Sequence, residues 1–340
     1  MKHLLILLIV ILSACSTTPK PPAVEFKSYP EQKKIDVFVE GSLFTSFIYP
    51  DDMEKQVLYP IFTASGKDVT RGFPMNPRPF ERTDHPHHVG LWLNFGDVNG
   101  LDFWNNSFAI APENKHRYGS IKLREIAEMN NPEGRLVVYS DWVDVDGNVL
   151  LTEKTTYLFE GDEFSRSIIR NTELTAAAEV TITENKEGLL GLRVDRAFEE
   201  PSQRPGRFLD ASGNVTEVPV LNNDGVNGVY RNAEGYTAGD VWSKRSGWVA
   251  LRADKEGEIV TLVILDHPKN PNYPAWSHAR GYGLFAHNNF AGRAVDENSS
   301  EVKHELSAGD IITLRHQVII GGDLSDDQIN QLANKFSAAF

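Results

Sequence analysis

The sequence predicts an all-β fold, a large β-sandwich with one short helix at its C-terminal end. Most of the chain consists of short segments rich in β-branched and aromatic residues, each bounded by Gly, Asp, Asn or Pro. Only the last stretch has a helical pattern, and no repeat with a period of about 20 to 50 residues is visible. Many strands, few helices and no repeat favour two large, strongly curved sheets over a propeller or a solenoid.

The predicted strands follow one another along most of the chain. They are KIDVFVEG, LFTSFIYP, RLVVYSDWVDV, VLLTEKTTYLFEG, FSRSIIRN, EVTITE, GWVALRAD, EIVTLVILD and IITLRHQVII. Asp146, Gly147 and Asn148 lie between two of them and predict a hairpin, because these residues suit a tight turn. Polar residues alternate along positions 152, 154 and 156, so one face of this hairpin is expected to be solvated.

The helix is predicted from its capping residues. Ser325 is expected to be the N-cap, Gln328 to close a capping box, and Leu324 to pack against Ile329. Apolar residues then recur at helical spacing, at positions 329, 332, 333 and 336. The helix is expected to pack this stripe on a sheet.

The first residues are typical of an export signal. A short basic start precedes an aliphatic run over 4–12 that is too short to span a bilayer. Leu12-Ser13-Ala14-Cys15 resembles the bacterial lipobox, in which the cysteine receives a lipid, and the alternative is an ordinary secretory signal. The predicted organisation is a lipoprotein signal peptide over 1–15, a flexible tether over 16–32 and a single β-sandwich domain over 33–340. Because Ser16 is not the aspartate that resembles an inner-membrane retention signal, the outer membrane is the expected location.

Composition limits the possible partners. The formal charge is −13, and losing Lys2 with the signal makes it −13 − 1 = −14. Nucleic acids and anionic membrane surfaces require basic patches, so neither is expected, and the membrane would be reached only through the lipid on Cys15. Cys15 is also the only cysteine, which excludes disulfides and cysteine-based chemistry in the domain. A neutral ligand suits this charge better.

The densest polar stretch is DHPHHVGLWLNFGDVNGLDFWNN, residues 84 to 106. Asn99 and Gly100 both tolerate positive φ and predict a tight turn, with a hairpin formed by VGLWLNF and LDFWNN. Period-two alternation places His88 and Trp92 on one face, and His87 on the other face with the apolar residues. The two adjacent histidines are therefore expected to diverge.

Three interpretations of the histidines stay open. His85, His87 and His88, together with a distant His278, His287 or carboxylate, are possible ligands of a divalent metal, although no standard zinc spacing occurs. One histidine near its natural pKa beside a carboxylate would do acid/base chemistry. Otherwise they cap loops or form hydrogen bonds in the core. Pro86 blocks a ladder hydrogen bond and places the group on a loop at the rim of the sheet.

A second dense stretch is LDHPKNPNYPAWSHARGYGLFAHNNFAG, residues 265 to 292, which repeats the Asp-His-Pro tripeptide at Asp266 and His267. Its prolines stiffen a loop, which helps to hold side chains over a ligand. Trp276, His278 and Arg280 then alternate and are expected to share a face. An indole, an imidazole and a guanidinium suit sugar binding, whereas the alternative makes Trp276 a core aromatic and Arg280 an ion-pair partner.

A site that cleaves or epimerises a sugar also needs one or two carboxylates near a histidine. Two cations are unusual. Arg193 lies inside an otherwise apolar run, and Arg71 is close enough along the chain to reach the rim. The candidate carboxylates are Asp97, Asp102, Glu187 and Asp266.

Five stretches together are similar to one bacterial family: TRGFPM, DHPHHVGLWLNFGDVNGLDFW, KEGLLGLRV, VWSKRSGWV and DHPKNPNYPAWSHARGYGLFAHN. They resemble the PmoA-like family, or methane oxygenase PmoA family, from about residue 45 to 320. We set methane oxidation aside, because no apolar run of about 18 residues follows the signal. The resemblance implies an exported protein involved in carbohydrate breakdown. The strand content and the ending LSAGDIITLRHQVIIGGD also resemble the supersandwich of galactose mutarotases, where a histidine and a carboxylate do acid/base chemistry.

The resemblance and the residue patterns together give one set of site residues. Catalysis is assigned to His85, His87, His88, Glu187 and Asp97, and substrate binding to Arg71, Asn99, Trp104, Arg193, Asp266, His267, Trp276, His278 and Arg280. Of these, Asn99 and Trp104 are implied by the resemblance alone.

The sequence thus predicts a lipid-anchored carbohydrate-active protein, a glycoside hydrolase or related sugar-transforming enzyme with histidine and carboxylate acid/base chemistry. The alternatives are a non-catalytic surface glycan-binding lipoprotein and a metal-dependent enzyme with histidine ligands. No cofactor is assigned other than the divalent metal of this last alternative.

Overall fold

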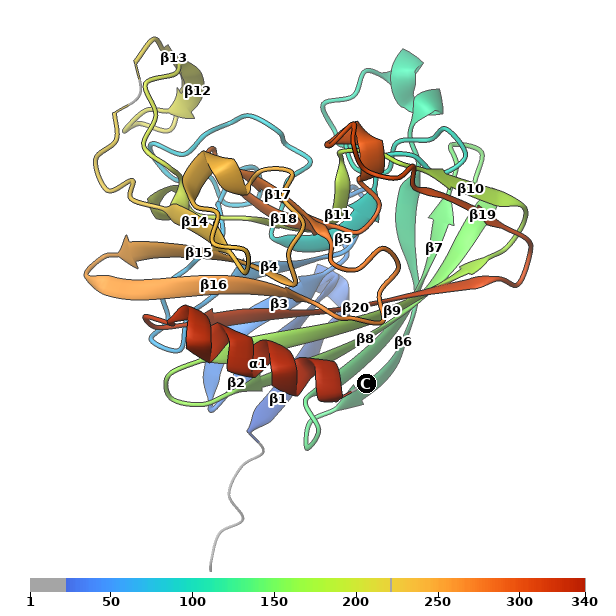
Figure 1. The fold of residues 1–340 in the computed structure, drawn as a ribbon, viewed down its shortest axis with the longest axis horizontal. Helices are drawn as coiled ribbons and strands as arrows, with labels where there is room; N and C mark the ends of the chain where they lie inside the picture. Colours follow the sequence, from blue (N-terminus) through green and yellow to red (C-terminus); the bar gives the residue numbers. More distant parts are fainter. Residues whose placement is uncertain (1–22, 221, 340) are drawn as a thin grey trace, which may run out of the picture.

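Two eight-stranded sheets form the body of the protein in the computed structural model, which describes residues 23–220 and 222–339 (Figure 1). The first sheet has the order β1 (Val24–Tyr29), β2 (Lys34–Val39), β3 (Ser42–Ile48), β4 (Val57–Ile61), β5 (Leu91–Phe95), β11 (Gly188–Arg193), β18 (Leu284–Asn288) and β17 (Trp276–Arg280). The second sheet has the order β14 (Val229–Asn232), β15 (Trp248–Lys255), β16 (Glu258–Asp266), β20 (Ile311–Gly321), β9 (Arg166–Ala176), β8 (Val149–Gly161), β7 (Arg135–Val143) and β6 (Ser120–Asn130).

Smaller elements complete the fold. Two small antiparallel sheets pair β10 (Val180–Thr183) with β19 (Lys303–Leu306), and β12 (Gly206–Leu209) with β13 (Val215–Val218). Short 3-10 helices lie at Pro30–Gln32, Pro112–Arg117, Arg196–Phe198, Ala238–Val241 and Gly292–Ala294, and the α-helix α1 spans Asp326–Ala338. Among the described residues no helix is both long and apolar enough to cross a membrane.

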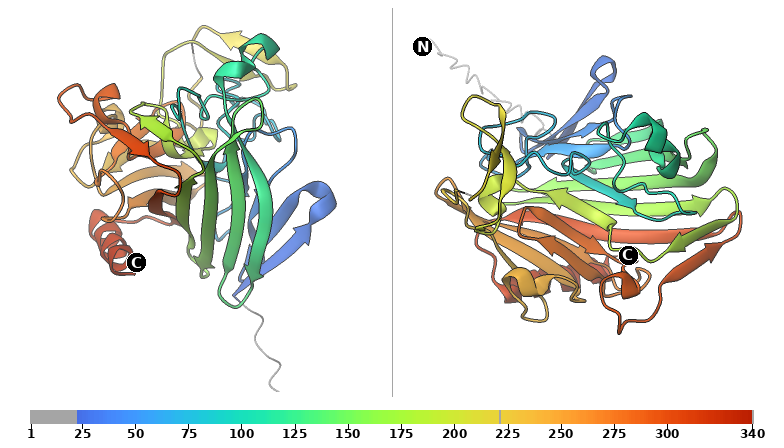
Figure 2. Two further views of the ribbon diagram at one scale, coloured as in Figure 1. Left: turned by 90° about the vertical axis from the view of Figure 1, so that its right-hand side faces the viewer. Right: turned by 90° about the horizontal axis from the view of Figure 1, so that it is seen from above.

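The main core lies between the two sheets. Phe47 and Leu93 from the first sheet pack in one buried cluster with Phe159, Ile264 and Leu314 from the second. The view from above shows the blue and cyan strands of the first sheet beside the green and orange strands of the second (Figure 2). Each fully buried large apolar side chain contributes about 1.5 to 3 kcal/mol relative to an exposed one, so this layer is the main source of stability. The predicted all-β sandwich with a C-terminal helix is confirmed.

The two sheets cover their outer faces differently. Helix α1 lies across the outside of the second sheet and packs Ile329 and Phe336 against Trp248 and Val263 (Figure 1). The outer face of the first sheet carries no α-helix among the described residues, and a cluster containing Tyr59, Trp92, Trp104, Leu284 and Ala286 covers it instead. The candidate site described below lies on this second cluster.

Most local predictions are confirmed. All the predicted strand segments contain strands, and residues 144–148 form the turn between β7 and β8. The capping box of Ser325 and Gln328 is present, and Ile329 and Phe336 are buried.

Two local predictions are wrong, one on the tether and one on a hairpin. Residues 24–32, assigned to a flexible tether, form β1 and a 3-10 turn, because alternating VEFKSY pairs with β2. The hairpin at Asn99 and Gly100 is reduced to a single bridge between Val98 and Leu101, because β4 and β11 already pair with β5 on both sides. The predicted signal peptide and Cys15 lie outside the described residues.

Truncation of Ile329 tests the contribution of α1. Ile329 has no exposed surface, so Ile329→Ala removes buried methyl groups and leaves a cavity. We expect a loss of about 2 to 5 kcal/mol in the free energy of unfolding, measured by denaturant titration. Gln331→Ala, on the exposed side of the same helix, is the control and is expected to change stability by less than about 0.5 kcal/mol. Equal effects would show that α1 does not stabilise the sheet.

Candidate functional site

A tight turn over residues 85–88 brings three imidazoles together. The His88 N–H donates to the His85 carbonyl at 3.0 Å, and His85 adopts a positive φ of 44°. The rings of His85 and His88 are stacked at 4.9 Å, and His87 meets His88 edge to face at 4.2 Å. The expectation that His87 and His88 diverge is therefore wrong, because both residues precede β5 and alternation does not apply in the turn. We call His85, His87 and His88 the histidine cluster.

Hydrogen bonds from the buried Arg71 side chain stabilise this turn. The Arg71 guanidinium, 1% exposed, donates to the carbonyl oxygens of Asp84, His85 and His88 at 2.7, 2.9 and 2.9 Å. It also pairs with the Asp84 carboxylate at 3.1 Å. Arg71 was predicted to bind substrate, but it is buried under the loop and positions the histidines instead.

Arg193 connects the same carboxylate to the histidine cluster. It is fully buried, and it donates to Asp84 Oδ1 at 2.7 Å and to His88 Nδ1 at 3.2 Å. Because a guanidinium only donates, His88 Nδ1 accepts, and the neutral ring carries its proton on Nε2. Arg193 is thus a positioning residue rather than the predicted substrate binder.

Electrostatics keep Asp84 ionised. Burial by itself would raise the pKa of Asp84, but Arg193, His85 and Arg71 together hold it well below its usual range. Asp84 Oδ1 also lies 3.2 Å from Nδ1 of His85, whose side chain is 39% exposed. His85 is therefore the accessible imidazole with an adjacent carboxylate.

Aromatic rings extend the cluster in both directions. Tyr282 stacks on His85 at 4.9 Å with an interplanar angle of 3°, and Trp92 stacks beneath His88 at 5.3 Å. Arg193 lies 5.0 Å from the centre of the Tyr282 ring. The stack is continuous from the half-buried Tyr282 to the buried Trp92.

Trp104 joins the histidine cluster to the distant segment 278–280. Its ring lies 5.6 Å from that of His88 and 5.9 Å from that of His278. The register explains the contact, since Trp92 is opposite Gly191, Gly191 is opposite Ala286, and Ala286 is opposite His278. A Cβ on Gly191 would lie 2.7 Å from Trp92 and 3.0 Å from Trp104, so only glycine allows this packing.

Arg280 and Trp242 lie at the rim beside His278. Trp242 meets His278 at 5.0 Å, and the Arg280 guanidinium lies 3.4 Å from the centre of the Trp242 ring. Both Trp242 and Arg280 are half-buried. His278 and Arg280 thus share a face, as predicted.

Several buried polar atoms of the site have no hydrogen-bond partner within the part of the chain that the structure describes. They are His87 Nε2, His88 Nε2, Trp92 Nε1 and Trp104 Nε1. The indole N–H groups and, from the tautomer above, His88 Nε2–H are donors only. An unpartnered buried donor costs about 1 to 3 kcal/mol, so these atoms require an acceptor from a ligand or water.

Burial keeps most of the histidines neutral. It lowers the pKa of His87 to about 2, with Lys55 and His85 adding to the effect, and lowers that of His88 well below its usual value. Burial, with Arg280, lowers the pKa of His278 to about 3. These three rings suit hydrogen bonding at neutral pH, and His85 is the imidazole of the cluster that is exposed to solvent.

The geometry does not fit the metal interpretation. The lone pairs of an imidazole lie in the ring plane, so the parallel rings of His85 and His88 do not direct them at one point. Within residues 23–220 and 222–339, no group of three His, Cys, Asp or Glu side chains is arranged to hold an ion. His85, His87, His88 and His278 are therefore not a ligand set.

Glu187 lies on the Arg280 side of the site. It is half-buried, pairs with Lys186, and acts electrostatically on both Arg280 and Tyr282. It is thus the predicted carboxylate that the fold places near the rim.

Asp97 and Asn99 are bound within their own turn. Asp97 Oδ1 accepts from Gly100 N at 3.0 Å, and Asn99 bonds the backbone of Glu179 and Thr181. These contacts fix the turn to β10, and a catalytic role for Asp97 or a binding role for Asn99 has no support from them.

The second Asp-His-Pro tripeptide, residues 266–268, lies outside the histidine cluster. Asp266 is buried with Asn270 and Asn289, and His267 packs edge to face on Phe336 of α1 at 5.2 Å. Neither residue contacts the histidine cluster, because β16 belongs to the second sheet. Trp276 is also a core residue, covered by Arg245 at 4.5 Å, so the core alternative is correct for it.

Four residues of the site were not predicted. Asp84 is next to the histidines in sequence, and Tyr282 continues the alternation of 278 and 280, so both had a local signal. Trp242 and Lys55 had none, because they reach the site through the packing of distant segments.

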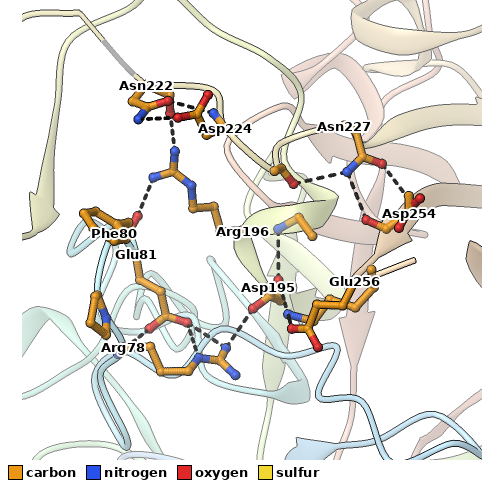
Figure 3. Close-up of a pocket in the computed structure, with 14 residues that line it drawn as sticks. Arg78, Phe80, Glu81, Asp195, Arg196, Asn222, Asp224, Asn227, Asp254 and Glu256 are labelled. Carbon is orange, nitrogen blue, oxygen red and sulfur yellow. Dashed lines mark hydrogen bonds and ion pairs between the residues drawn. The ribbon is translucent and has the colours of Figure 1, made fainter. Parts of the chain in front are cut away.

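A cavity of about 940 Å³ is a different feature (Figure 3). Its main cations already have partners: Arg78 contacts Glu81 and Asp195, and Arg196 donates to the carbonyls of Phe80 and Asn222. None of its lining residues belongs to the histidine cluster. Paired charges leave little for a ligand to satisfy, so we place the site at the histidine cluster.

One family model matches residues 34–334, and it is described as a family of unknown function (DUF6807). The chain belongs to the DUF6807 family. That description names no activity, and the resemblance to the PmoA-like family stays a prediction. No curated protein matches the sequence.

Solved structures similar to this DUF6807 member are distant. A protein of Synechocystis sp. PCC 6803, Slr1438, has a TM-score of 0.37 and 11% identity over 91% of this chain and 99% of its own. The galactosidase domain of the alpha-galactosidase-sucrose kinase AgaSK has a TM-score of 0.36 and 9% identity, and the match covers 87% of this chain and 41% of that chain. A galactose mutarotase-like protein from Clostridium acetobutylicum has a TM-score of 0.33 and 8% identity, and the match covers 89% of this chain and 99% of that chain. These values are too low to support an argument about chemistry.

Asp84→Asn tests whether the carboxylate holds the site together. The substitution leaves two buried guanidinium groups without a counter-charge. We expect a loss of about 2 to 3 kcal/mol in unfolding free energy, less than for a fully buried pair because Asp84 is 30% exposed. Asp141→Asn, which breaks a surface pair with Arg124, is the control and is expected to cost about 0 to 1 kcal/mol.

The pH dependence of this difference has a defined sign. The folded pKa of Asp84 is lowered, so its stabilisation is complete above the unfolded value near 3.9 and is lost as the pH falls through the folded pKa. The stability gap between wild type and Asp84→Asn should therefore be constant at neutral pH and narrow only in strong acid. A gap that closes above about pH 5 would contradict the pairing.

Proposed function

We propose that the protein is a carbohydrate-active enzyme, a glycoside hydrolase or a related sugar-transforming enzyme, with its active site at the histidine cluster. The observation that carries the proposal is the set of buried donors without acceptors on His88, Trp92 and Trp104. These groups are buried and contact one another, so their acceptors, from a ligand or from water, would have to lie close together. A saccharide has such acceptors in its oxygen atoms and also apolar C–H faces that pack on aromatic rings.

Proton transfer is assigned to His85. It is the exposed imidazole of the cluster, and the ionised Asp84 lies beside its Nδ1 and orients the ring. Glu187 is proposed as the second acid/base group, because it acts electrostatically on Arg280 and Tyr282 at the rim. This assignment differs from the sequence prediction, which distributed catalysis over five residues.

Substrate binding is assigned to the half-buried groups of the rim. Trp242 and Tyr282 offer ring surface, and Arg280 donates charged hydrogen bonds to hydroxyl or carboxylate oxygens. Their partial exposure allows them to meet a ligand, unlike Arg71 and Arg193, which are buried beneath the histidines.

The catalytic proposal is tested with His85→Asn and Glu187→Gln against a panel of plant and algal oligosaccharides. Loss of a positioned acid or base should reduce turnover by about 10² to 10⁴-fold, while binding changes by only a few fold. Product release and binding are measured separately. The exposed histidine variant His116→Asn is the control and should keep wild-type turnover.

Two outcomes would contradict the proposal. Full turnover by His85→Asn would remove this imidazole from the mechanism. Binding without turnover by the wild-type protein on every oligosaccharide would identify a non-catalytic glycan-binding protein.

We further propose that the protein is anchored in the cell envelope, at the outer membrane, by a lipid on Cys15. The support is the lipobox-like sequence alone. Cys15→Ser should release the protein from the membrane fraction, because one thiol is the only attachment point, and metabolic labelling with a radioactive fatty acid should fail. A Ser13→Ala variant, which keeps a small residue before the cleavage site, should remain anchored. Membrane attachment of the Cys15→Ser protein would refute lipidation at this residue.

A further inference from the structure

We propose that the cavity beside His87 binds the carboxylate of an acidic saccharide, such as a uronic acid, and that Lys55 is its counter-charge. The inference rests on the proposed function, since it names the class of saccharide. The cavity has a volume of about 270 Å³, which suits one sugar unit or less. Apolar side chains line part of it, including Met53, Met75 and Phe108, and its polar lining includes Lys55, His87 and Ser107.

Lys55 is a buried cation without an ion pair. Its side chain is 5% exposed, and its ammonium donates to the His87 carbonyl at 2.7 Å. Within the described residues no carboxylate lies within ion-pair distance of Lys55, and no second hydrogen bond is formed. An ammonium has three N–H donors, and a buried charge is stable only when it is paired. The cavity therefore has room for an anion where Lys55 requires one.

Ser107 offers a donor beside Lys55 in the cavity lining. The Lys55 ammonium also lies 5.3 Å from the centre of the Trp92 ring, which is not among the residues that line the cavity. Ser107 accepts from Ala109 N, which leaves its hydroxyl hydrogen available. A carboxylate accepts hydrogen bonds and donates none, whereas a neutral hydroxyl would bring a further donor into a donor-rich site.

Two acidic residues also line the cavity, and neither provides the missing charge. Glu54 uses one carboxylate oxygen for Lys115 and the other for Ser120. Asp52 is exposed at the surface, where solvent screens it. The local balance around Lys55 therefore stays positive.

The protonation of Lys55 makes binding sensitive to pH. Burial lowers the pKa of Lys55 to about 7, although Glu54 and Asp102 act in the opposite direction. The free protein thus loses the ammonium as the pH rises above about 7, and carboxylate binding favours its retention. Affinity for an acidic sugar should fall in that range, whereas affinity for a neutral sugar should not.

The test compares the binding of matched acidic and neutral sugars by calorimetry. The probes are glucuronate- and galacturonate-terminated oligosaccharides, and the same oligosaccharides with the carboxyl group reduced to an alcohol. Wild type should bind the acidic members about tenfold or more tightly. Lys55→Met should lose this preference, and Lys55→Arg, which keeps the charge, should retain part of it. Lys154→Met, at an exposed lysine paired with Glu173, is the control and should behave like wild type.

Each outcome separates the two proposals. Removal of a buried charge is often neutral or stabilising, so Lys55→Met should fold, and its melting temperature checks this. Equal wild-type affinity for the acidic and reduced sugars would overturn the carboxylate subsite, even if His85-dependent turnover of neutral sugars supports the proposed function. Lys55-dependent binding of acidic sugars without any turnover would support the subsite and reject the enzyme. Acetate binding as tight as that of the sugars would show an anion site only and overturn the saccharide assignment.

Discussion

One shared carboxylate holds the site together. Asp84 pairs with Arg71 and with Arg193, and both guanidinium groups are almost wholly buried. One carboxylate cannot neutralise two cations: burial, then Arg193, lowers the pKa of Arg71 to about 9. The carbonyl oxygens of the 84–88 loop supply the remaining negative potential. The loop must therefore keep its backbone oxygens turned towards Arg71, and this fixes where the three imidazoles point.

The outer face of the first sheet explains why the site lies there. The second sheet buries its outer apolar side chains under α1, whereas the first sheet covers its own with Trp92 and Trp104. Indoles bring N–H donors that aliphatic side chains would not, and Gly191 lets both rings lie close to the strand. A helix of apolar residues in this place would have left no unpaired donors. The face thus keeps unpaired donors because rings rather than a helix cover it.

Sequence patterns predicted the parts of the structure that depend on neighbours in the chain. The strands, the capped helix and the shared face of His278 and Arg280 follow from short-range periodicity. The contact between Trp104 and His278 requires that β5, β11 and β18 lie side by side, and no local pattern contains that order. The two Asp-His-Pro tripeptides show the limit most clearly: one lies in the site, and the other contacts α1 on the second sheet. Identical local sequence gave no information on which sheet would carry the loop.

Charge shows a similar difference between the whole chain and the site. The formal charge of −13 suggested a neutral ligand, since distant carboxylates would repel an acidic one. Salt screens exposed charges beyond a Debye length of about 8 to 10 Å, while groups in a buried cavity interact in a lower dielectric. The electrostatic interactions of a bound ligand are therefore determined mainly by the residues that contact it. Here these include Lys55, with its ammonium held by one carbonyl, and the side chains of His87 and Ser107. A strongly acidic protein can accordingly contain a small site that favours an acidic sugar, and the average charge of its surface says little about that preference.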